Sequence, residues 1–215
     1  MRYSVMQKTN SFAMPNKAYF NISQGSAEWQ AIRSGVITGT GIANLITASG
    51  KLSESEAAKR YIRELQFERR FKECLELLFP SPVTYAMQRG KEMESEALRG
   101  FDVFSEFCSC GFVLHDSGIF GVSPDSVKID EFGKILTGLE IKCPQSRSAF
   151  IDLWECRNGN DLRKANFAYW LQVQLSMYVC ECSTWNFFAY VTGYSNTFVV
   201  EKDSTIFELF DKIKI

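Results

Sequence analysis

Two acidic residues and a lysine stand out between residues 121 and 144, where they interrupt segments that are otherwise apolar or turn-forming. Asp125 ends the segment Gly-Val-Ser-Pro-Asp, and Glu140 and Lys142 lie two residues apart in Gly-Leu-Glu-Ile-Lys-Cys-Pro. Residues i and i+2 of a strand share a face, so Glu140 and Lys142 point the same way. The apolar residues between and beside them point into a core; they are Leu139, Ile141 and Cys143. The polar face of this strand is therefore available for chemistry.

A hairpin is predicted between the two acids, with one strand over 126–130, a turn at Glu-Phe-Gly-Lys and a return strand from Ile135. Such a hairpin sets Asp125 beside Glu140. Two crowded carboxylates repel each other unless a cation lies between them, and oxygen ligands favour Mg²⁺ or Mn²⁺ over Zn²⁺. Lys142 would orient and help deprotonate an attacking water, or stabilise a developing negative charge. The alternative is a surface hairpin with an incidental Glu-x-Lys pair, and only the neighbouring motifs separate the two.

The composition is that of an ordinary globular protein. Hydrophobic residues make up 46% and charged residues 23% of the 215-residue chain. No apolar run approaches the ~18 residues of a membrane span, and residues 1–19 lack the apolar centre of a signal peptide. These features predict a cytoplasmic protein with no membrane partner.

The cysteine count and the net charge exclude some classes of site. Seven cysteines without paired C-x-x-C clusters argue against a disulfide framework and a structural zinc, so reduced thiols are expected. A net charge of −1 gives no global sign of nucleic-acid binding. Any phosphate binding must come from local patches.

The amino-terminal third offers one such patch. After an irregular segment over 1–24, expected to be an arm or an edge, a helix is predicted from Ser26, its N-cap, to Arg33, ending at Ser34-Gly35. Val-Ile-Thr-Gly-Thr-Gly then leads into a second helix with Ile42, Leu45 and Ile46. Hydroxyls, helix-start amides and the nearby Arg33 would make an anion pocket. An ordinary loop and cap is the alternative.

Two amphipathic helices follow. A capping box at Ser53-x-x-Glu56 predicts a helix that runs to Leu78 and is stopped by Phe-Pro-Ser-Pro. Its polar side mixes both signs of charge, which indicates a solvated face or, alternatively, a rim that faces DNA. A second helix is predicted over 85–101. Gly90 within it suggests a close backbone approach, and Glu94 falls on its packed side, where an acid needs a partner.

The carboxyl-terminal half is predicted to alternate helices and strands. Helices are expected over 146–154 and 162–180, strands over 184–191 and 197–201, and a last helix over 205–213. The helix over 162–180 is too apolar for a surface helix, and its two glutamines, Gln172 and Gln174, need hydrogen-bond partners. No repeat or linker is visible, so a single α/β domain over 1–215 is expected.

Taken in order, these motifs resemble the PD-(D/E)xK nuclease core, which has a central mixed sheet flanked by helices. Within that superfamily the chain is most similar to the bacteriophage lambda exonuclease family of YqaJ-type viral recombinases. The resemblance covers about residues 24–202. It rests on five blocks in order: Trp29…Arg33-x-Gly35-Val-Ile-Thr38-x-Thr40, Gly90-Lys-x-x-Glu94, Ser123-Pro-Asp125, Leu139-Glu-x-Lys142-Cys-Pro144 and Gln172-Val-Gln174-x-Ser176-Met.

The resemblance implies a Mg²⁺-dependent alkaline 5′→3′ exonuclease that degrades one strand of duplex DNA. It further implies two metal ions, with Mn²⁺ as a substitute, a ring-shaped homotrimer, and 3′ overhangs that a single-strand annealing protein would use in phage recombination. The implied metal ligands are Asp125, Glu140 and the Ile141 carbonyl, supported by Glu94. Lys142 would activate the attacking water, with Gln172 beside it. The implied pocket for the 5′-phosphate comprises Arg33, Thr40, Ser123 and Arg147.

Three residues depart from the family pattern. Ser126 stands where a glycine is usual, Thr40 replaces a serine, and Arg147 is offset by one position. Two other functions remain open: a structure- or site-specific endonuclease on the same core, and a catalytically idle DNA-binding module. No separate base-reading element is visible for the first. The second predicts loss of Asp125, Glu140 or Lys142, and all three are present.

Overall fold

The computed structural model describes residues 17–71, 85–100 and 106–215, and within them the strands form two sheets. The smaller sheet has the order β1-β2-β3 and is antiparallel. The larger has the order β4-β5-β6-β7 and is mixed, because β5 and β6 run parallel. The strands are β1 (Lys17–Tyr19), β2 (Phe112–Leu114), β3 (Gly121–Val122), β4 (Ser126–Ile129), β5 (Ile135–Lys142), β6 (Thr184–Val191) and β7 (Tyr194–Glu201).

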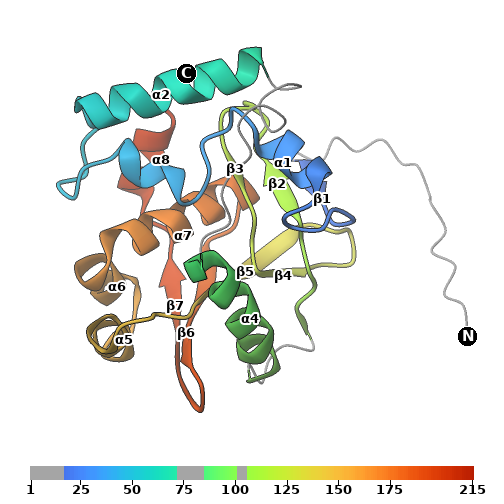
Figure 1. Ribbon diagram of the computed structural model, residues 1–215, viewed down its shortest axis with the longest axis vertical. Helices are drawn as coiled ribbons and strands as arrows, with labels where there is room; N and C mark the ends of the chain where they lie inside the picture. Colours follow the sequence, from blue (N-terminus) through green and yellow to red (C-terminus); the bar gives the residue numbers. More distant parts are fainter. Residues whose placement is uncertain (1–16, 72–84, 101–105) are drawn as a thin grey trace, which may run out of the picture.

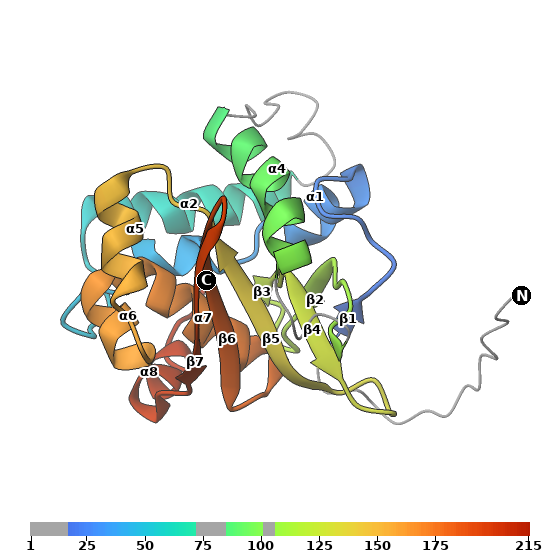
Figure 2. The same cartoon turned by 90° about the horizontal axis from the view of Figure 1, so that it is seen from below.

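Helices cover both faces of the larger sheet (Figures 1 and 2). Helix α7 (Phe167–Cys180) packs with the core on one face, and α4 (Tyr85–Gly100) places Ala97 against Leu139 and Ile141 on the other. The remaining helices are α1 (Ala27–Arg33), the 3₁₀ helix η1 (Gly41–Asn44), α2 (Glu56–Arg70), α5 (Arg147–Trp154), α6 (Gly159–Ala165) and α8 (Ser204–Phe210). The predicted mixed sheet flanked by helices is confirmed.

The hairpin β4–β5 has the predicted turn and strands, except that β4 ends one residue early and the pairing shifts register between Lys128 and Ile129. Ser126 pairs with Leu139, which places Asp125 opposite Glu140 at the open end of the hairpin. The Asp130 carboxylate closes the turn by accepting hydrogen bonds from two backbone amides of the turn, each at 2.9 Å. Because side chains alternate along β5, Glu140 faces α7 while its two apolar neighbours face α4.

Several predicted boundaries were wrong. Ser55, not Ser53, caps α2, since its hydroxyl accepts the Ala58 amide at 3.1 Å. The helix ends at Arg70 rather than continuing to Leu78, and the predicted Phe-Pro-Ser-Pro stop lies outside the described residues. The predicted helix over 162–180 is two helices, because Asn166 adopts an extended conformation and caps α7 through the Tyr169 amide.

Smaller differences concern single residues and ends. An added Cβ at Gly90 would meet no atom within 4 Å among the described residues, so the predicted close approach is absent there. Strand β7 begins at Tyr194, earlier than predicted, and α8 ends at Phe210, earlier than predicted. The six cysteines in the described ranges are free thiols, and Cys74 lies outside them. No helix in these ranges has the length and hydropathy to cross a membrane.

The residue that follows α7 has a backbone conformation whose free-energy cost can be tested. Glu181 is the one non-glycine residue with positive φ in the described ranges, at 54°. A left-handed conformation costs an L-residue about 1–2 kcal/mol, and glycine escapes this cost. We expect Glu181→Gly to raise the melting temperature by about 2–4 °C, measured by calorimetry. Glu208→Gly, inside α8, should lower it. Lower stability for both variants would contradict the argument.

Candidate active site

The corner between β3 and β4 carries Asp125 and is fixed by hydrogen bonds from two directions. The Asp125 carboxylate accepts the Ile141 amide at 2.6 Å, which ties the corner to β5. From the amino-terminal segment, the Gln24 side-chain amide donates to the Pro124 carbonyl at 2.9 Å and to the Cys110 carbonyl at 3.3 Å. The last residues of the predicted arm therefore hold the corner that presents Asp125.

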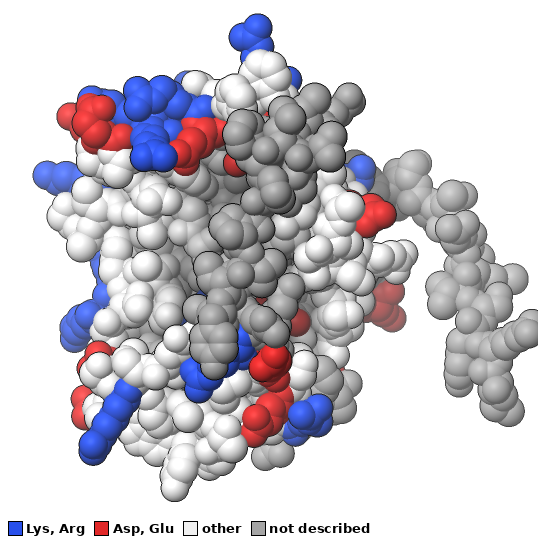
Figure 3. Space-filling view, in the orientation of Figure 1, with Lys and Arg blue, Asp and Glu red and all other residues white. Residues whose placement is uncertain are grey.

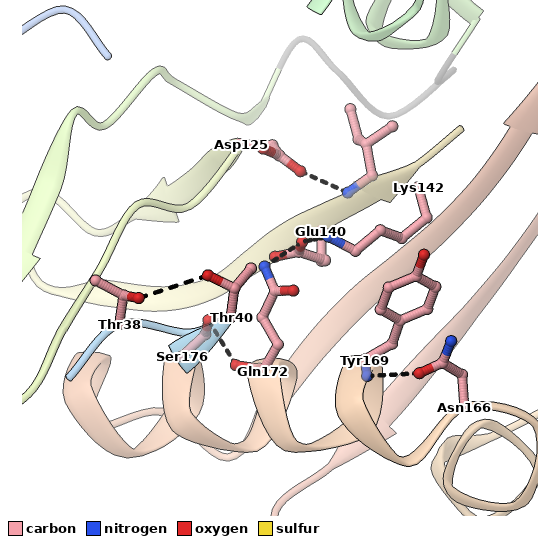
Figure 4. Close-up of polar contacts among 10 residues, drawn as sticks. Thr38, Thr40, Asp125, Glu140, Lys142, Asn166, Tyr169, Gln172 and Ser176 are labelled. Carbon is pink, nitrogen blue, oxygen red and sulfur yellow. Dashed lines mark hydrogen bonds and ion pairs between the residues drawn. The ribbon is translucent and has the colours of Figure 1, made fainter. Parts of the chain in front are cut away.

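Glu140 is buried, with 3% of its surface exposed, and one of its oxygens has two donors. Its Oε1 accepts the Lys142 ammonium at 2.5 Å and the Gln172 amide at 2.6 Å (Figure 4). Burying a carboxylate is costly unless it is paired and hydrogen-bonded. The sequence thus supplies the partners that keep a charged acid inside the fold, and the predicted group of Glu140, Lys142 and Gln172 is assembled.

The electrostatics of the site reflect crowding of like charges. Burial raises the pKa of Asp125 well above its ordinary value, and the neighbouring Glu140 and Glu94 raise it further. Burial alone would lower the pKa of Lys142, but Glu140 and Asp125 outweigh that effect and raise it. Lys142 is therefore an ammonium held beside Glu140 and Asp125.

Glu94 lies on α4, where it is half-buried, and its charge raises the pKa of Asp125. Its predicted place on the packed side of its helix agrees with this position. Ile141, whose carbonyl is a predicted ligand, is itself buried in β5 between Glu140 and Lys142. The four residues of the predicted ligand set thus come from α4, the corner before β4, and β5; they are Glu94, Asp125, Glu140 and Ile141.

These residues fit a hard divalent cation. The donors are oxygens, and a cation would offset both the burial and the acid–acid repulsion that raise the pKa of Asp125. Among the described residues no group of three or more His, Cys, Asp or Glu side chains is arranged to hold a metal. Mg²⁺ is usually held by one or two carboxylates together with waters and substrate phosphates, so Asp125 and Glu140 would hold it only with such further ligands.

Tyr169 belongs to the site and was not predicted. The Lys142 ammonium lies over its ring, 5.0 Å from the centroid, and Figure 4 shows the ring beside the lysine. Tyr169 precedes Gln172 by three residues on α7, so the two side chains share one face of the helix. That spacing, together with the assignment of Gln172, was the signal that could have found it. Gln174, by contrast, is structural, because it donates to the Glu201 carbonyl at 2.9 Å.

Two residues of the predicted phosphate pocket meet at Trp29. The Arg33 guanidinium lies over the indole ring, 4.1 Å from its centroid. The indole N–H donates to the Ser123 hydroxyl at 2.8 Å and to the Gly111 carbonyl at 3.1 Å. A hydroxyl that accepts still has its own proton to donate. Because Ser123 is two residues from Asp125, this cluster adjoins the corner of the acidic site.

Thr40 lies in a loop that packs against α7. A Cβ added at Gly39 would lie 2.9 Å from the Gln172 side chain, so the loop reaches the residue that binds Glu140. The predicted helix with Ile42 is a single 3₁₀ turn, η1, and the Gly41 amide donates to the Thr38 hydroxyl at 3.3 Å. The amides expected to face an anion are thus partly used within the loop. The Thr40 hydroxyl lies 3.5 Å from that of Thr38.

Arg147 is the exposed first residue of α5, after the N-cap Ser146. Its place in the phosphate pocket stays a prediction. Ser126 is buried at the start of β4, where it pairs with Leu139, so the departure from glycine is accommodated within the hairpin.

Known proteins that resemble this chain include members of one sequence family and several solved structures. A model of the YqaJ-like viral recombinase domain matches residues 28–194. Comparison with curated protein sequences gave no significant match. Among solved structures, an alkaline exonuclease (LHK-Exo) from Laribacter hongkongensis is similar with a TM-score of 0.64 and 22% identity, over 86% of this chain and 87% of that chain.

Two further structures show the same likeness. LHK-Exo in complex with dAMP gives a TM-score of 0.62 at 22% identity, over 86% of this chain and 87% of that chain. A phage related exonuclease from Haemophilus somnus 129PT gives 0.52 at 14% identity, over 82% and 88%. At these identities the structures show the fold. The family model covers most of the chain, from α1 to the start of β7, and the protein belongs to the YqaJ-like viral recombinase domain family.

Proposed function

We propose that the protein is a metal-dependent nuclease that degrades one strand of double-stranded DNA from a 5′-phosphorylated end, in the 5′→3′ direction. The family and the exonuclease likenesses support a nuclease. The observation that carries the proposal is the shared Glu140 oxygen, which accepts both Lys142 and Gln172 directly beside the Asp125 corner. A structural ion pair alone would not need a second acid, Asp125, hydrogen-bonded to the backbone of the same strand.

The chain's own residues supply the positioning and the charge. Asp125, Glu140 and the Ile141 carbonyl would hold Mg²⁺ or Mn²⁺, and Glu94 would support them from α4. A bound ion of this kind polarises a phosphate and lowers the pKa of water. Lys142, an ammonium within reach of Glu140, would orient the attacking water and offset the negative charge that develops on the phosphate. Gln172 would hold the Glu140 carboxylate in one orientation.

The decisive experiment compares linear and closed circular duplexes in Mg²⁺. We expect a linear duplex with a 5′-phosphate to be shortened from that end, leaving a 3′ single-stranded overhang, while covalently closed circles remain intact. Strand-specific end labels report the polarity. Circles cut as fast as linear DNA would favour the alternative, a structure- or site-specific endonuclease on the same core.

Calcium should separate binding from cleavage. Its coordination shell is larger and looser than the octahedral shell of Mg²⁺, so it should leave the DNA end bound without placing the attacking water correctly. We expect DNA-end binding in Ca²⁺, measured by fluorescence anisotropy, with cleavage near background. Adding Mg²⁺ to the same sample should start the reaction. Rapid turnover in Ca²⁺ alone would contradict the proposed metal site.

The assembly in solution is proposed to be a closed homotrimer, which rests on the family resemblance. A ring retains DNA by enclosure, and this is compatible with a net charge of −1. Light scattering should give about three times 24.5 kDa. A monomer that is active on long duplexes would contradict it. The 3′ overhangs would then pass to a single-strand annealing protein in the cytoplasm of a phage-infected cell.

A further inference from the structure

The last turn of α2 binds both backbone groups of Gly35. The Glu68 carboxylate accepts the Gly35 amide at 2.7 Å, and the Arg69 side chain donates from Nε to the Gly35 carbonyl at 2.7 Å. These are charge-assisted hydrogen bonds to a buried backbone, made by two consecutive residues. Gly35 lies two residues after Arg33, so α2 fixes the chain at the point where it leaves the proposed phosphate contact.

Only glycine fits at this point. Gly35 has a φ of +72°, and an added Cβ would lie 2.4 Å from the Arg69 side chain and 3.0 Å from its backbone nitrogen. The turn is therefore pressed directly onto α2. The close approach is what brings the two charged side chains within reach of both backbone groups.

Arg69 also reaches a second turn. Its Nη2 donates to the Gly118 carbonyl at 2.9 Å, in the turn between β2 and β3. The two turns lead into segments that pair side by side, because the Ile37 amide donates to the Ile119 carbonyl at 2.8 Å and the Gly121 amide to the Ile37 carbonyl at 3.0 Å. One segment begins just after Arg33, and the other leads to Ser123. A single guanidinium thus sets the register of the two chains that present these residues.

A third contact extends the support along the loop. Tyr61, two turns earlier on α2, faces the loop beside Thr38; burial raises the pKa of its phenol, and Thr38 lowers that pKa by a smaller amount. A Cβ at Gly41 would lie 1.9 Å from the Tyr61 oxygen, so the loop closes tightly on this residue. α2 therefore touches the loop over 33–41 at its beginning and near its end.

The outer face of α2 has a different character. Figure 3 shows basic and acidic side chains mingled over this helix. Exposed pairs account for part of the mixture, such as Lys59 with Glu56 and Arg60 with Glu64. Such exposed ion pairs contribute little to the stability of the fold. The charges that bind the backbone of the loop are on the turn that faces it, and they are Glu68 and Arg69.

We infer that Glu68 and Arg69 are positioning residues for recognition of the 5′ end, because they hold the Arg33 and Ser123 segments in register without touching DNA themselves. This inference rests on the proposed function and assigns to α2 a role in end discrimination rather than in general DNA affinity. Replacing Arg69 by lysine keeps the charge but loses the planar fork that serves two carbonyls at once.

The test measures the ratio of degradation rates on 5′-phosphorylated and 5′-hydroxyl duplexes. We expect Arg69→Lys to lower this ratio at least about fivefold, because a displacement of about 1 Å of a substrate-positioning group costs up to about a hundredfold. The rate on hydroxyl ends should change less than the ratio does. Arg60→Lys makes the same substitution in an exposed ion pair on the same helix, and it should leave the ratio unchanged.

A second pair of variants covers the case in which Arg69→Lys does not fold. Glu68→Ala removes the acceptor for the Gly35 amide and should lower the rate ratio. Glu68→Gln retains an acceptor oxygen and should keep the rate ratio close to that of the wild type. A lower melting temperature with an unchanged ratio in these variants would overturn the inference, leaving α2 a purely structural support. A wild-type protein that degrades both ends equally would instead overturn the proposed phosphate pocket, and the inference with it.

Discussion

Lys142→Ala and Glu140→Gln are each expected to lower the rate of duplex degradation by at least about a hundredfold, the scale of a lost proton-transfer or charge-stabilising group. Lys142 donates to Glu140 at 2.5 Å, and both lie on the face of β5 that meets α7 rather than in the apolar cluster under α4. Glu140→Gln retains the shape of the side chain but loses the charge that would hold a cation. Single-turnover degradation of an end-labelled duplex measures the effect.

DNA-end binding provides the internal control for these variants. We expect both to bind a phosphorylated end in Ca²⁺ about as well as the wild type, since the proposed end contacts lie in a different cluster around Trp29. Two matched substitutions on the same hairpin control for generic effects. Lys128→Ala, on β4, removes an ion pair with Glu106, and Glu131→Gln changes an exposed residue of the turn. Wild-type turnover by Lys142→Ala or Glu140→Gln would remove the active-site assignment.

The acidic site could be predicted in part, because some of its determinants are local. The turn chemistry after Asp130 starts the hairpin, but a register shift between Lys128 and Ile129, which was not predicted, brings Asp125 opposite Glu140 rather than Leu139. The alternation along β5 put Glu140 and Lys142 on one face. Glu94 and Gln172 required the family resemblance, because no periodic pattern says which strand a helix will cover.

Contacts made by long surface side chains could not be predicted. Glu68 and Arg69 stand among many charged residues of α2, where a mixed run indicates a solvated face, yet they bind a glycine more than thirty residues earlier in the chain. Gln24 likewise reaches the Pro124 carbonyl from a segment without regular pattern. Sequence spacing carries no signal for such contacts, since it is the folded chain that places a carbonyl within their reach.

Two boundary errors have a common physical origin. The helix break at Asn166 and the start of α2 at Ser55 are each set by a side chain that accepts a nearby backbone amide. Short polar residues compete with the helix for backbone partners wherever they occur. Ser53 and Ser55 were both able to cap, and the structure uses Ser55, whose hydroxyl in turn accepts a hydrogen bond from Ser53 at 2.9 Å. When several residues that can cap a helix lie so close together, the sequence does not show at which of them the helix begins.

The protein is expected to prefer a 5′-phosphorylated end over a 5′-hydroxyl end, and Arg33→Ala should remove most of that preference. A charge-assisted hydrogen bond is worth about 1.5–3 kcal/mol, which corresponds to roughly a ten- to hundredfold difference in rate if the contact is used in every cycle. The ratio of initial rates on the two substrates measures it. Arg60→Ala removes the same charge from an exposed pair on α2 and should leave the ratio intact.

The physical reason for expecting a preference, and not merely affinity, is where Arg33 lies. Its guanidinium is held over Trp29, and the same indole binds Ser123, two residues from Asp125, so a terminal phosphate bound there would place the adjacent linkage near the carboxylates. Each cleavage leaves a new 5′-phosphate on the shortened strand. That phosphate can enter the same pocket, draw the next nucleotide into register and give the motion its direction. Equal rates on both ends in the wild type would show that Arg33 does not read the terminus, and the directional argument would fail with it.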